Sequence, residues 1–200
     1  MRHPTTTRVG STDGVEVGVH DYGGEGPLVF FVHGTGMVSR MWEPVMAELG
    51  ASVRPVGIDL RGPGVSSFPA EVRCDDFRMV ADICAVFDHF GARDAFIVGH
   101  SMGGGTALLA ALARPGAIAA AWVYEPIIFE RADDRPEGAT NFIEMTLRRR
   151  AEFGSRAEVI ERYGSRPPLD EMHPDCLAAP RRFWARERPH SGRGCSRKEG

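Results

Sequence analysis

Ser101 lies in a segment whose residue types can support nucleophilic catalysis. It stands in Gly99-His100-Ser101-Met102-Gly103, after an apolar run and before a segment of small residues. The pattern predicts a strand that turns abruptly into a helix at Ser101, and it matches G-x-S-x-G, the pattern of a nucleophile elbow. Gly99 and Gly103 would let strand and helix approach closely, and the Met102 N–H would point at a developing oxyanion. The alternative is a glycine-rich turn with a helix-capping serine, and the strand-then-helix context favours the elbow.

Alternating strands and helices must hold this corner in place. Continuous apolar runs that end in glycine are typical of parallel strands buried on both faces, and apolar residues at helical spacing follow them. This alternation predicts an α/β fold with a mostly parallel sheet and ligand sites at the carboxyl ends of the strands. We expect an amino-terminal hairpin over 7–23, strands over 27–34, over 52–60, through Val98 and over 118–124, and helices over 38–49, 75–90 and 102–113.

Two further motifs follow predicted strands. His33-Gly34-Thr35-Gly36 ends the strand over 27–34, and Asp59-Leu60-Arg61-Gly62-Pro63-Gly64-Val65-Ser66 ends the next strand. Each motif alone is explained by an ordinary turn. Together with the elbow, in this order and at this spacing, they make residues 7–129 resemble the α/β-hydrolase family, whose fold is a mostly parallel sheet flanked by helices.

The resemblance gives each motif a role. The segment that begins at His33 resembles the family's oxyanion loop, so the backbone N–H groups of Thr35 and Met102 would hold the oxyanion. The motif that begins at Asp59 has a structural role in the family, where it shapes the loop after a strand, and Pro63 stands where the family often has histidine. Structural roles in the elbow and the oxyanion loop would fall to His33, Gly34, Gly99 and Gly103.

The resemblance also implies a hydrolase that works through a serine nucleophile and an acyl-enzyme, without a cofactor. A small carboxylic ester is the default substrate, and hydrolysis of a carbon–carbon bond is an alternative because such family members also use serine. Haloalkane dehalogenases and epoxide hydrolases normally have aspartate as the nucleophile, so Ser101 argues against both. A further alternative is a catalytically inactive remnant or a ligand-binding module of the same fold.

No histidine in the sequence is convincing as the general base. A serine hydroxyl is a poor nucleophile until a base takes its proton, and the family places that histidine after the last strand of the sheet. His100 should point away from Ser101 because side chains alternate along a strand, and His33 is expected to anchor its loop. Glu125, after the strand over 118–124, is a candidate acid, although a structural role is favoured. The other histidines lie away from the site or follow no buried strand: His3, His20, His89, His173 and His190.

The carboxyl-terminal part of the chain departs from the expected pattern. After a core over 1–129, residues 130–179 resemble the start of a helical cap. The last strands of the family's sheet are missing, so the strand over 118–124 would be an unpaired edge. Residues 180–200 are rich in Arg, Gly, Ser and Pro and lack apolar periodicity. We interpret them as the product of a truncated or frameshifted gene in preference to a natural disordered tail.

Composition adds few constraints. Of 200 residues, 42% are hydrophobic and 26% charged, as is ordinary for a globular protein. The net charge of −3 gives no reason to expect nucleic acid or an acidic membrane as a partner, and no apolar run approaches the length of a membrane span. The four cysteines are scattered without zinc-binding spacing. We therefore expect a cytoplasmic protein with a small-molecule substrate and no metal, and the sequence leaves its oligomeric state open.

Overall fold

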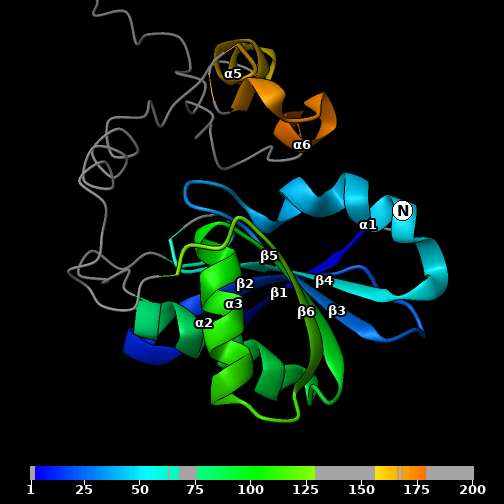
Figure 1. Cartoon of the computed structure of the whole chain (residues 1–200), viewed down its shortest axis with the longest axis vertical. Helices are drawn as coiled ribbons and strands as arrows, with labels where there is room; N and C mark the ends of the chain where they lie inside the picture. The colour runs from blue at the N-terminus through cyan, green and yellow to red at the C-terminus, as the bar shows by residue number, and fades with distance from the viewer. Residues whose placement is uncertain are drawn as a thin grey trace, which may run out of the picture.

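A computed structural model describes residues 3–62, 64–67, 76–128, 156–165, 167 and 169–178 (Figure 1). Every strand and helix expected up to residue 124 is confirmed, and the helix expected over 38–49 is divided into a 3-10 turn and an α-helix. Pro44 lies in the first turn of that α-helix, where its missing N–H costs no hydrogen bond. The elements are β1 Thr5–Gly10, η1 Thr12–Gly14, β2 Glu16–Asp21, β3 Leu28–Val32, η2 Ser39–Trp42, α1 Glu43–Leu49, η3 Gly50–Ser52, β4 Arg54–Asp59, α2 Asp76–Phe90, β5 Ala95–His100, α3 Met102–Ala113, β6 Ile118–Tyr124, α5 Arg156–Tyr163, η5 Leu169–Glu171 and α6 Pro174–Ala178.

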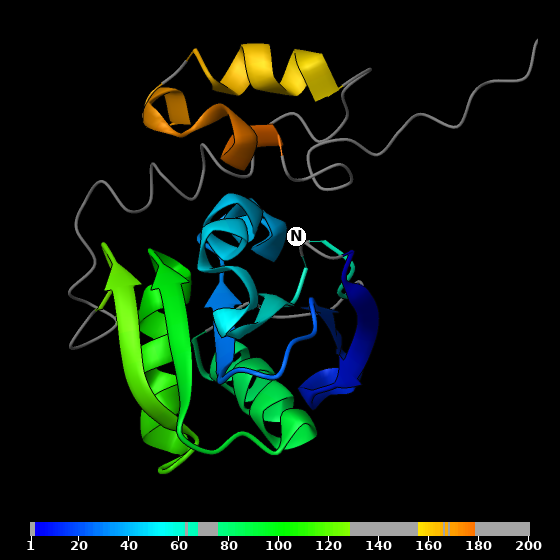
Figure 2. The ribbon, with the colours of Figure 1, turned by 90° about the vertical axis from the view of Figure 1, so that its right-hand side faces the viewer.

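The strands form one six-stranded sheet in the order β1-β2-β4-β3-β5-β6 (Figure 2). β1 and β2 form the expected hairpin, and β2 joins β4 in antiparallel register. The pairs β3–β4, β3–β5 and β5–β6 are parallel. The carboxyl ends of β3 and β5 therefore emerge side by side, and these are the ends that carry the oxyanion-loop and elbow motifs.

Helices cover the two faces of this sheet. α2 and α3 lie on one face, and α1 lies on the other (Figure 1). On the first face Phe30 packs between Phe87 and Phe90, with ring centroids 5.0 and 5.9 Å apart, inside the larger apolar cluster. On the second face Phe31 and Trp42 belong to a smaller buried cluster. The central strands are thus buried on both sides, which is why their sequences are continuously apolar.

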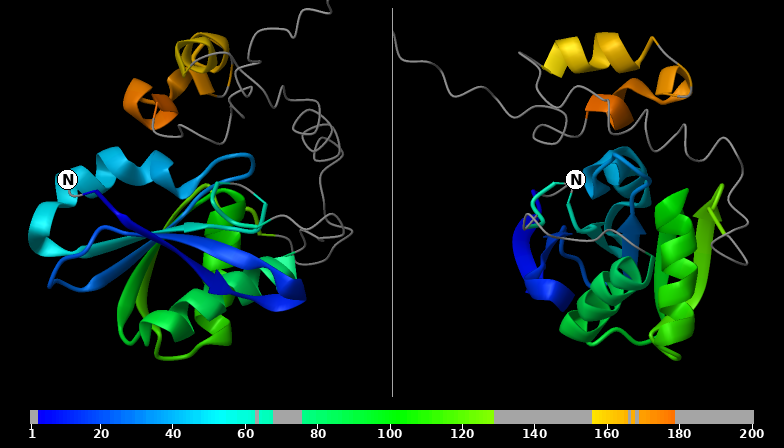
Figure 3. Two further views of the ribbon diagram at one scale, coloured as in Figure 1. Left: turned by 180° about the vertical axis from the view of Figure 1, so that it is seen from behind. Right: turned by 90° about the vertical axis from the view of Figure 1, so that its left-hand side faces the viewer.

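The two edges of the sheet differ in chemistry. β1 and β6 lie at opposite edges (Figure 3). β1 is polar, with the sequence TTTRVG, whereas β6 is IAAAWVY and carries no charge. On β6, Trp122 is 58% exposed and Tyr124 is 53% exposed. Among the described residues β6 pairs only with β5, as the sequence led us to expect.

The described residues beyond 128 include the short helices α5, η5 and α6. Leu169 and Leu177 are buried, and Met172 packs against the cluster that contains Trp42. The division into a core, a cap over 130–179 and a tail over 180–200 stays a prediction, because 129–155 and 179–200 lie outside the described residues. No helix in the described ranges has the length and apolar character to cross a bilayer.

Candidate active site

Ser101 stands at a strained corner between β5 and α3. Its backbone has φ 54° and ψ −122°, a conformation that non-glycine residues rarely adopt and that costs on the order of 1–3 kcal/mol. Backbone hydrogen bonds hold this conformation: the Ser101 N–H donates to the Tyr124 carbonyl at 2.9 Å, and the Ile127 N–H donates to the Ser101 carbonyl at 3.0 Å. The end of β6 and the residues after it thus hold the backbone of Ser101 in place, although they lie outside the motif over 99–103.

Close packing around the corner explains the glycines of the elbow. A Cβ on Gly103 would stand 2.3 Å from the His33 carbonyl oxygen, so α3 could not begin beside β3 with a larger residue there. A Cβ on Gly99 would lie 2.7 Å from the Gly104 Cα, which is the approach of helix to strand that the sequence pattern predicts.

The loop after β3 reaches the same corner. A Cβ on Gly34 would be 3.3 Å from the Ser101 Cβ. Thr35 follows Gly34 in this loop, and Met102 opens α3 directly after Ser101. Neither backbone N–H donates a hydrogen bond to a described residue. The role of these two N–H groups as oxyanion donors stays a prediction.

His33 anchors the loop after β3 and is fully buried. The Leu60 N–H donates to its Nε2 at 3.1 Å, so Nε2 carries no proton, and Nδ1 lies 2.8 Å from the Gly34 carbonyl to which it donates. Burial lowers the pKa of this imidazole and keeps it neutral. Both ring nitrogens are engaged with backbone, so His33 is a structural residue.

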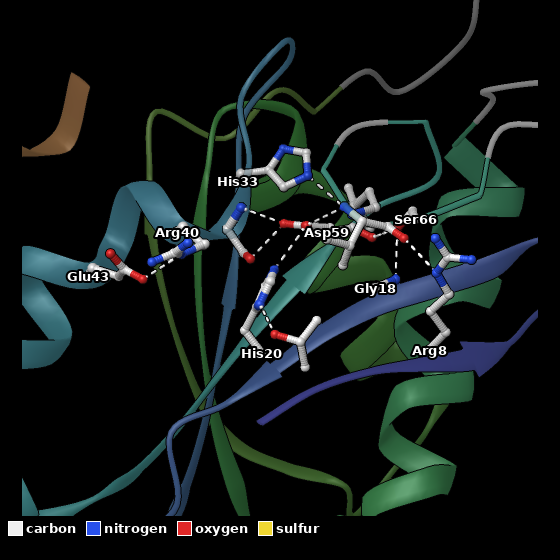
Figure 4. A network of polar contacts seen from close by, with 12 residues as sticks. Arg8, Gly18, His20, His33, Arg40, Glu43, Asp59 and Ser66 are labelled. Atoms are coloured by element: carbon white, nitrogen blue, oxygen red, sulfur yellow. Dashed lines mark hydrogen bonds and ion pairs between the residues drawn. The ribbon is translucent and has the colours of Figure 1, made fainter. Parts of the chain in front are cut away.

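Asp59 organises the loops on either side of β4 (Figure 4). Its carboxylate accepts hydrogen bonds from the N–H and Oγ of Ser39 at 2.8 and 2.6 Å and from the Val65 N–H at 3.0 Å. Its Oδ2 also lies 3.1 Å from His20 Nε2. Burial alone would raise the pKa of Asp59, but the hydrogen bonds from His20 and Ser39 lower it to about 2. The network ties β2, β4 and the segment before α1 together.

Arg61, two residues later, also has a structural position. Its side chain is buried and bonds the Asp82 carboxylate of α2 through Nε at 2.9 Å and through a terminal nitrogen at 2.8 Å. It also reaches Asp13 at 3.2 Å. Two hydrogen bonds from one guanidinium to one carboxylate fix the relative orientation of the two side chains. The sequence analysis singled out neither Asp82 nor His20 as partners of this motif.

His100 faces Gly34 and Tyr124. A Cβ on Gly34 would be 2.6 Å from its Nδ1, and its ring stacks on that of Tyr124 with centroids 5.7 Å apart. Nδ1 is buried and has no hydrogen-bond partner among the described residues. Burial lowers the pKa of His100, so the ring is neutral. The ring therefore packs between the loop after β3 and β6.

No described imidazole forms a hydrogen bond with Ser101. His20 lies between Thr6 and Asp59, and His173 contacts Asp175 at the start of α6. His190 falls outside the described residues. The general base thus stays unassigned.

Glu125 follows β6 directly and is exposed, with φ 45°. Its negative charge raises the pKa of His100, against the larger lowering that burial causes. It makes no hydrogen bond to a described histidine, and its role as the acid stays a prediction.

A cavity of about 790 Å³ lies elsewhere in the molecule. Tyr22, Met46 and Pro55 are among its lining residues, at the start of β4 and the end of α1. The site at Ser101 is beyond the carboxyl ends of the parallel strands, where α/β sheets bind ligands, and this cavity is at the other end. We therefore place the candidate site at the elbow.

Comparison with known proteins identifies the family. A model of the alpha/beta hydrolase fold matches residues 27–150. The 2-hydroxymuconate semialdehyde hydrolase of Pseudomonas sp. (strain CF600) is 34% identical over 105 residues, which are 51% of this chain and 37% of that protein. The chain spans less than half the length of this relative.

Solved structures show the same fold. The crystal structure of E-2-(acetamidomethylene)succinate hydrolase superposes with a TM-score of 0.71 and 23% identity, over 89% of this chain and 63% of that one. A thermophilic esterase from Thermogutta terrifontis gives a TM-score of 0.64 and 25% identity, over 88% of this chain and 68% of that one. With its matched motifs and its mostly parallel six-stranded sheet, the chain belongs to the alpha/beta hydrolase fold family.

Proposed function

We propose that the protein is a serine hydrolase in which Ser101 attacks the carbonyl carbon of a small carboxylic ester. The observation that carries the proposal is the strained backbone of Ser101 at the corner of β5 and α3. Strain of this kind gathers at functional sites, where the surrounding structure maintains it. Relatives that match the chain include hydrolases, and the esterase from Thermogutta terrifontis shares the fold.

The reaction would proceed through an acyl-enzyme. Ser101 Oγ forms a bond to the carbonyl carbon, its proton passes to a base, and the oxyanion is held by the N–H groups of Thr35 and Met102. Collapse of the tetrahedral intermediate breaks the ester C–O bond, and the leaving alkoxide takes a proton to depart as the alcohol. Water then hydrolyses the acyl-serine and releases the acid. Hydrogen bonds from these two N–H groups would stabilise the developing charge.

Hydrolysis of a carbon–carbon bond is a second candidate reaction for the same serine. Its support is the 34% identity to 2-hydroxymuconate semialdehyde hydrolase, because the compound in that name contains no ester group. The nucleophile and the oxyanion donors would be the same, and the leaving group would be a carbanion equivalent.

A ligand-binding module of the same fold is a third candidate. The observation that favours it is the lack of any described imidazole bonded to Ser101. Loss of the histidine in a serine hydrolase costs on the order of 10⁶ in turnover, and oxyanion stabilisation with binding leaves roughly 10³–10⁴ over water.

Turnover of nitrophenyl esters with acyl chains of increasing length distinguishes these candidates. For an esterase we expect saturable hydrolysis that depends on acyl length and is lost in Ser101→Ala. Ser52→Ala is the matched control, since Ser52 is exposed and bonds only a nearby carbonyl. Saturable ligand binding without turnover would support the binding module, and ester turnover that survives in Ser101→Ala would refute the proposed nucleophile.

A further inference from the structure

The loop over 33–38, between β3 and η2, contains a tight turn. The Met37 N–H donates to the Gly34 carbonyl at 3.1 Å, and Gly36, the third residue of the turn, has φ 71°, a value that favours glycine. The hydrogen bond of the turn does not use the N–H of its second residue, Thr35. The direction of the Thr35 N–H therefore depends on how the two ends of the loop are held.

Two adjacent residues at the end of β4 hold the two ends of this loop. At its beginning, the Leu60 N–H donates to His33 Nε2 at 3.1 Å. Directly after it, the N–H and Oγ of Ser39 both donate to Asp59 Oδ1, at 2.8 and 2.6 Å (Figure 4). His33 and Ser39 are fully buried, so water does not compete for these hydrogen bonds. The loop is thus fixed to the end of β4 on both sides.

Ser39 lies directly against β4 because residue 57 is glycine. A Cβ on Gly57 would be 2.8 Å from the Ser39 Oγ and 3.0 Å from the Ser39 Cβ. Three residues later, the Trp42 indole N–H donates to the Val32 carbonyl at 3.2 Å, which ties η2 to the last residue of β3. The close contact with Gly57 and the hydrogen bonds to Asp59 together define the position of Ser39.

The Asp59 carboxylate is matched to a set of four donors. In addition to the two donors of Ser39, it accepts from the Val65 N–H at 3.0 Å, and its Oδ2 lies 3.1 Å from His20 Nε2, which donates to it. An ionised carboxylate offers acceptors only, as these donors require. An asparagine would bring an NH2 group against some of the same donors, so the whole set of hydrogen bonds forms only with an aspartate.

We propose that Ser39 and Asp59 are positioning residues, which hold the Thr35 N–H in place for the chemical step at Ser101 without contacting the substrate. The inference rests on the proposed function, in which the Thr35 N–H is an oxyanion donor. The loop lies against the serine, since a Cβ on Gly34 would be 3.3 Å from the Ser101 Cβ. A donor that shifts away from the developing charge stabilises the transition state less, whereas binding of the ground state changes little.

Ser39→Ala and Ser11→Ala form a matched pair of variants. Each removes a serine hydroxyl that donates to a buried aspartate, Asp59 in the first case and Asp82 in the second. We expect both substitutions to lower the urea midpoint by similar amounts, because each leaves a buried carboxylate with one donor fewer. Only Ser39 adjoins the loop over 33–38, so only Ser39→Ala should change the reaction at Ser101.

Phosphonylation by a fluorophosphonate measures the chemical step separately from binding. The Ser101 Oγ forms a bond to phosphorus and fluoride leaves, while the P=O oxygen takes the place of the oxyanion. Labelling at increasing probe concentrations gives a maximal rate and a half-saturating concentration. We expect Ser39→Ala to lower the maximal rate at least about tenfold and to change the half-saturating concentration less than about twofold. Ser11→Ala should match the parent chain in both quantities.

Gly57→Ala provides a second perturbation that keeps both the Ser39 hydroxyl and Asp59. Its Cβ would displace Ser39, so we expect a slower maximal rate here too. Equal maximal rates in Ser39→Ala and Ser11→Ala, or a change confined to the half-saturating concentration, would overturn the positioning role and leave Ser101 as the nucleophile. A parent chain that is not labelled at Ser101 would overturn the proposed function and this inference together.

Discussion

Gly34 and Ser101 come from loops far apart in the sequence, yet a Cβ on Gly34 would stand only 3.3 Å from the Ser101 Cβ. The contact exists because β3 and β5 are adjacent parallel strands whose carboxyl ends emerge together. It places the Thr35 N–H and the Met102 N–H on the two segments that flank the serine. The site geometry therefore depends on how closely these loops pack.

Gly34→Ala should separate the two loops. The added Cβ would lie 2.6 Å from His100 Nδ1, and the His100 ring cannot move freely because it stacks on Tyr124. Overpacking of this kind costs roughly 1–3 kcal/mol. We expect a lower urea midpoint and at least a tenfold loss of reaction at Ser101. Gly10→Ala, at a position with nothing within 4 Å, is the control, and equal effects of the two substitutions would contradict the close packing.

Arg61→Ala should be the most destabilising change in the loop after β4. It leaves the buried Asp82 carboxylate without the guanidinium that donates two hydrogen bonds to it. Removal of one partner of a buried ion pair costs roughly 3–5 kcal/mol of unfolding free energy. Arg114→Ala removes an exposed pair with Asp88 and should cost about 1 kcal/mol or less. Urea unfolding of both variants measures the contrast, and similar losses of stability would be inconsistent with the network described for Arg61.

The Asp59 network predicts a pH dependence of stability. The pKa of Asp59 is about 2 in the folded chain and 3.8 as its ordinary value, so the folded state favours the ionised carboxylate. Its stabilisation is complete above pH 4 and is lost as the pH falls towards 2, which corresponds to about 2 kcal/mol.

Asp59→Asn removes this dependence because it cannot ionise. The difference in unfolding free energy between the parent chain and Asp59→Asn should be largest near pH 6 and at most about half as large at pH 2.5. Asp170→Asn, at an exposed aspartate, should match the parent at both pH values. A gap between parent and Asp59→Asn that stays constant from pH 6 to pH 2.5 would rule out ionisation of Asp59 as its source.

Much of the fold could be predicted from local pattern. The helix over 102–113 and the strand over 118–124 have the predicted boundaries, because glycines and a change from helical to continuous apolar spacing mark their ends. The corner at Ser101 between β5 and α3 could be predicted for the same reason, since strand, turn and helix are contiguous in the sequence.

Contacts between distant segments could not be predicted in this way. Hydrophobic periodicity reports which side of an element is buried, but it does not say which strands are neighbours. The contact of Gly34 with Ser101, the His20 contact with Asp59 and the Arg61–Asp82 pair all depend on the strand order β1-β2-β4-β3-β5-β6. The roles of Ser101, Thr35, Met102 and Glu125 in a reaction stay predictions.

The pH profile of the Ser101 reaction distinguishes a hydroxyl with a base from one without. With a histidine base the rate levels off above the pKa of the imidazole. For the binding module, in which no histidine serves Ser101, we expect the rate to rise about tenfold per pH unit from pH 6 to pH 9. A plateau near pH 7 would show that a residue outside the described ranges, or a moved imidazole, supplies the base.

Covalent labelling by a fluorophosphonate tests most directly whether Ser101 is the positioned nucleophile. We predict a single phosphonyl adduct, which peptide mapping places on Ser101, that is lost in Ser101→Ala and in the urea-unfolded chain and retained in Ser52→Ala. An adduct on another residue, or equal labelling of Ser101→Ala and the parent chain, would contradict the assignment of the active site.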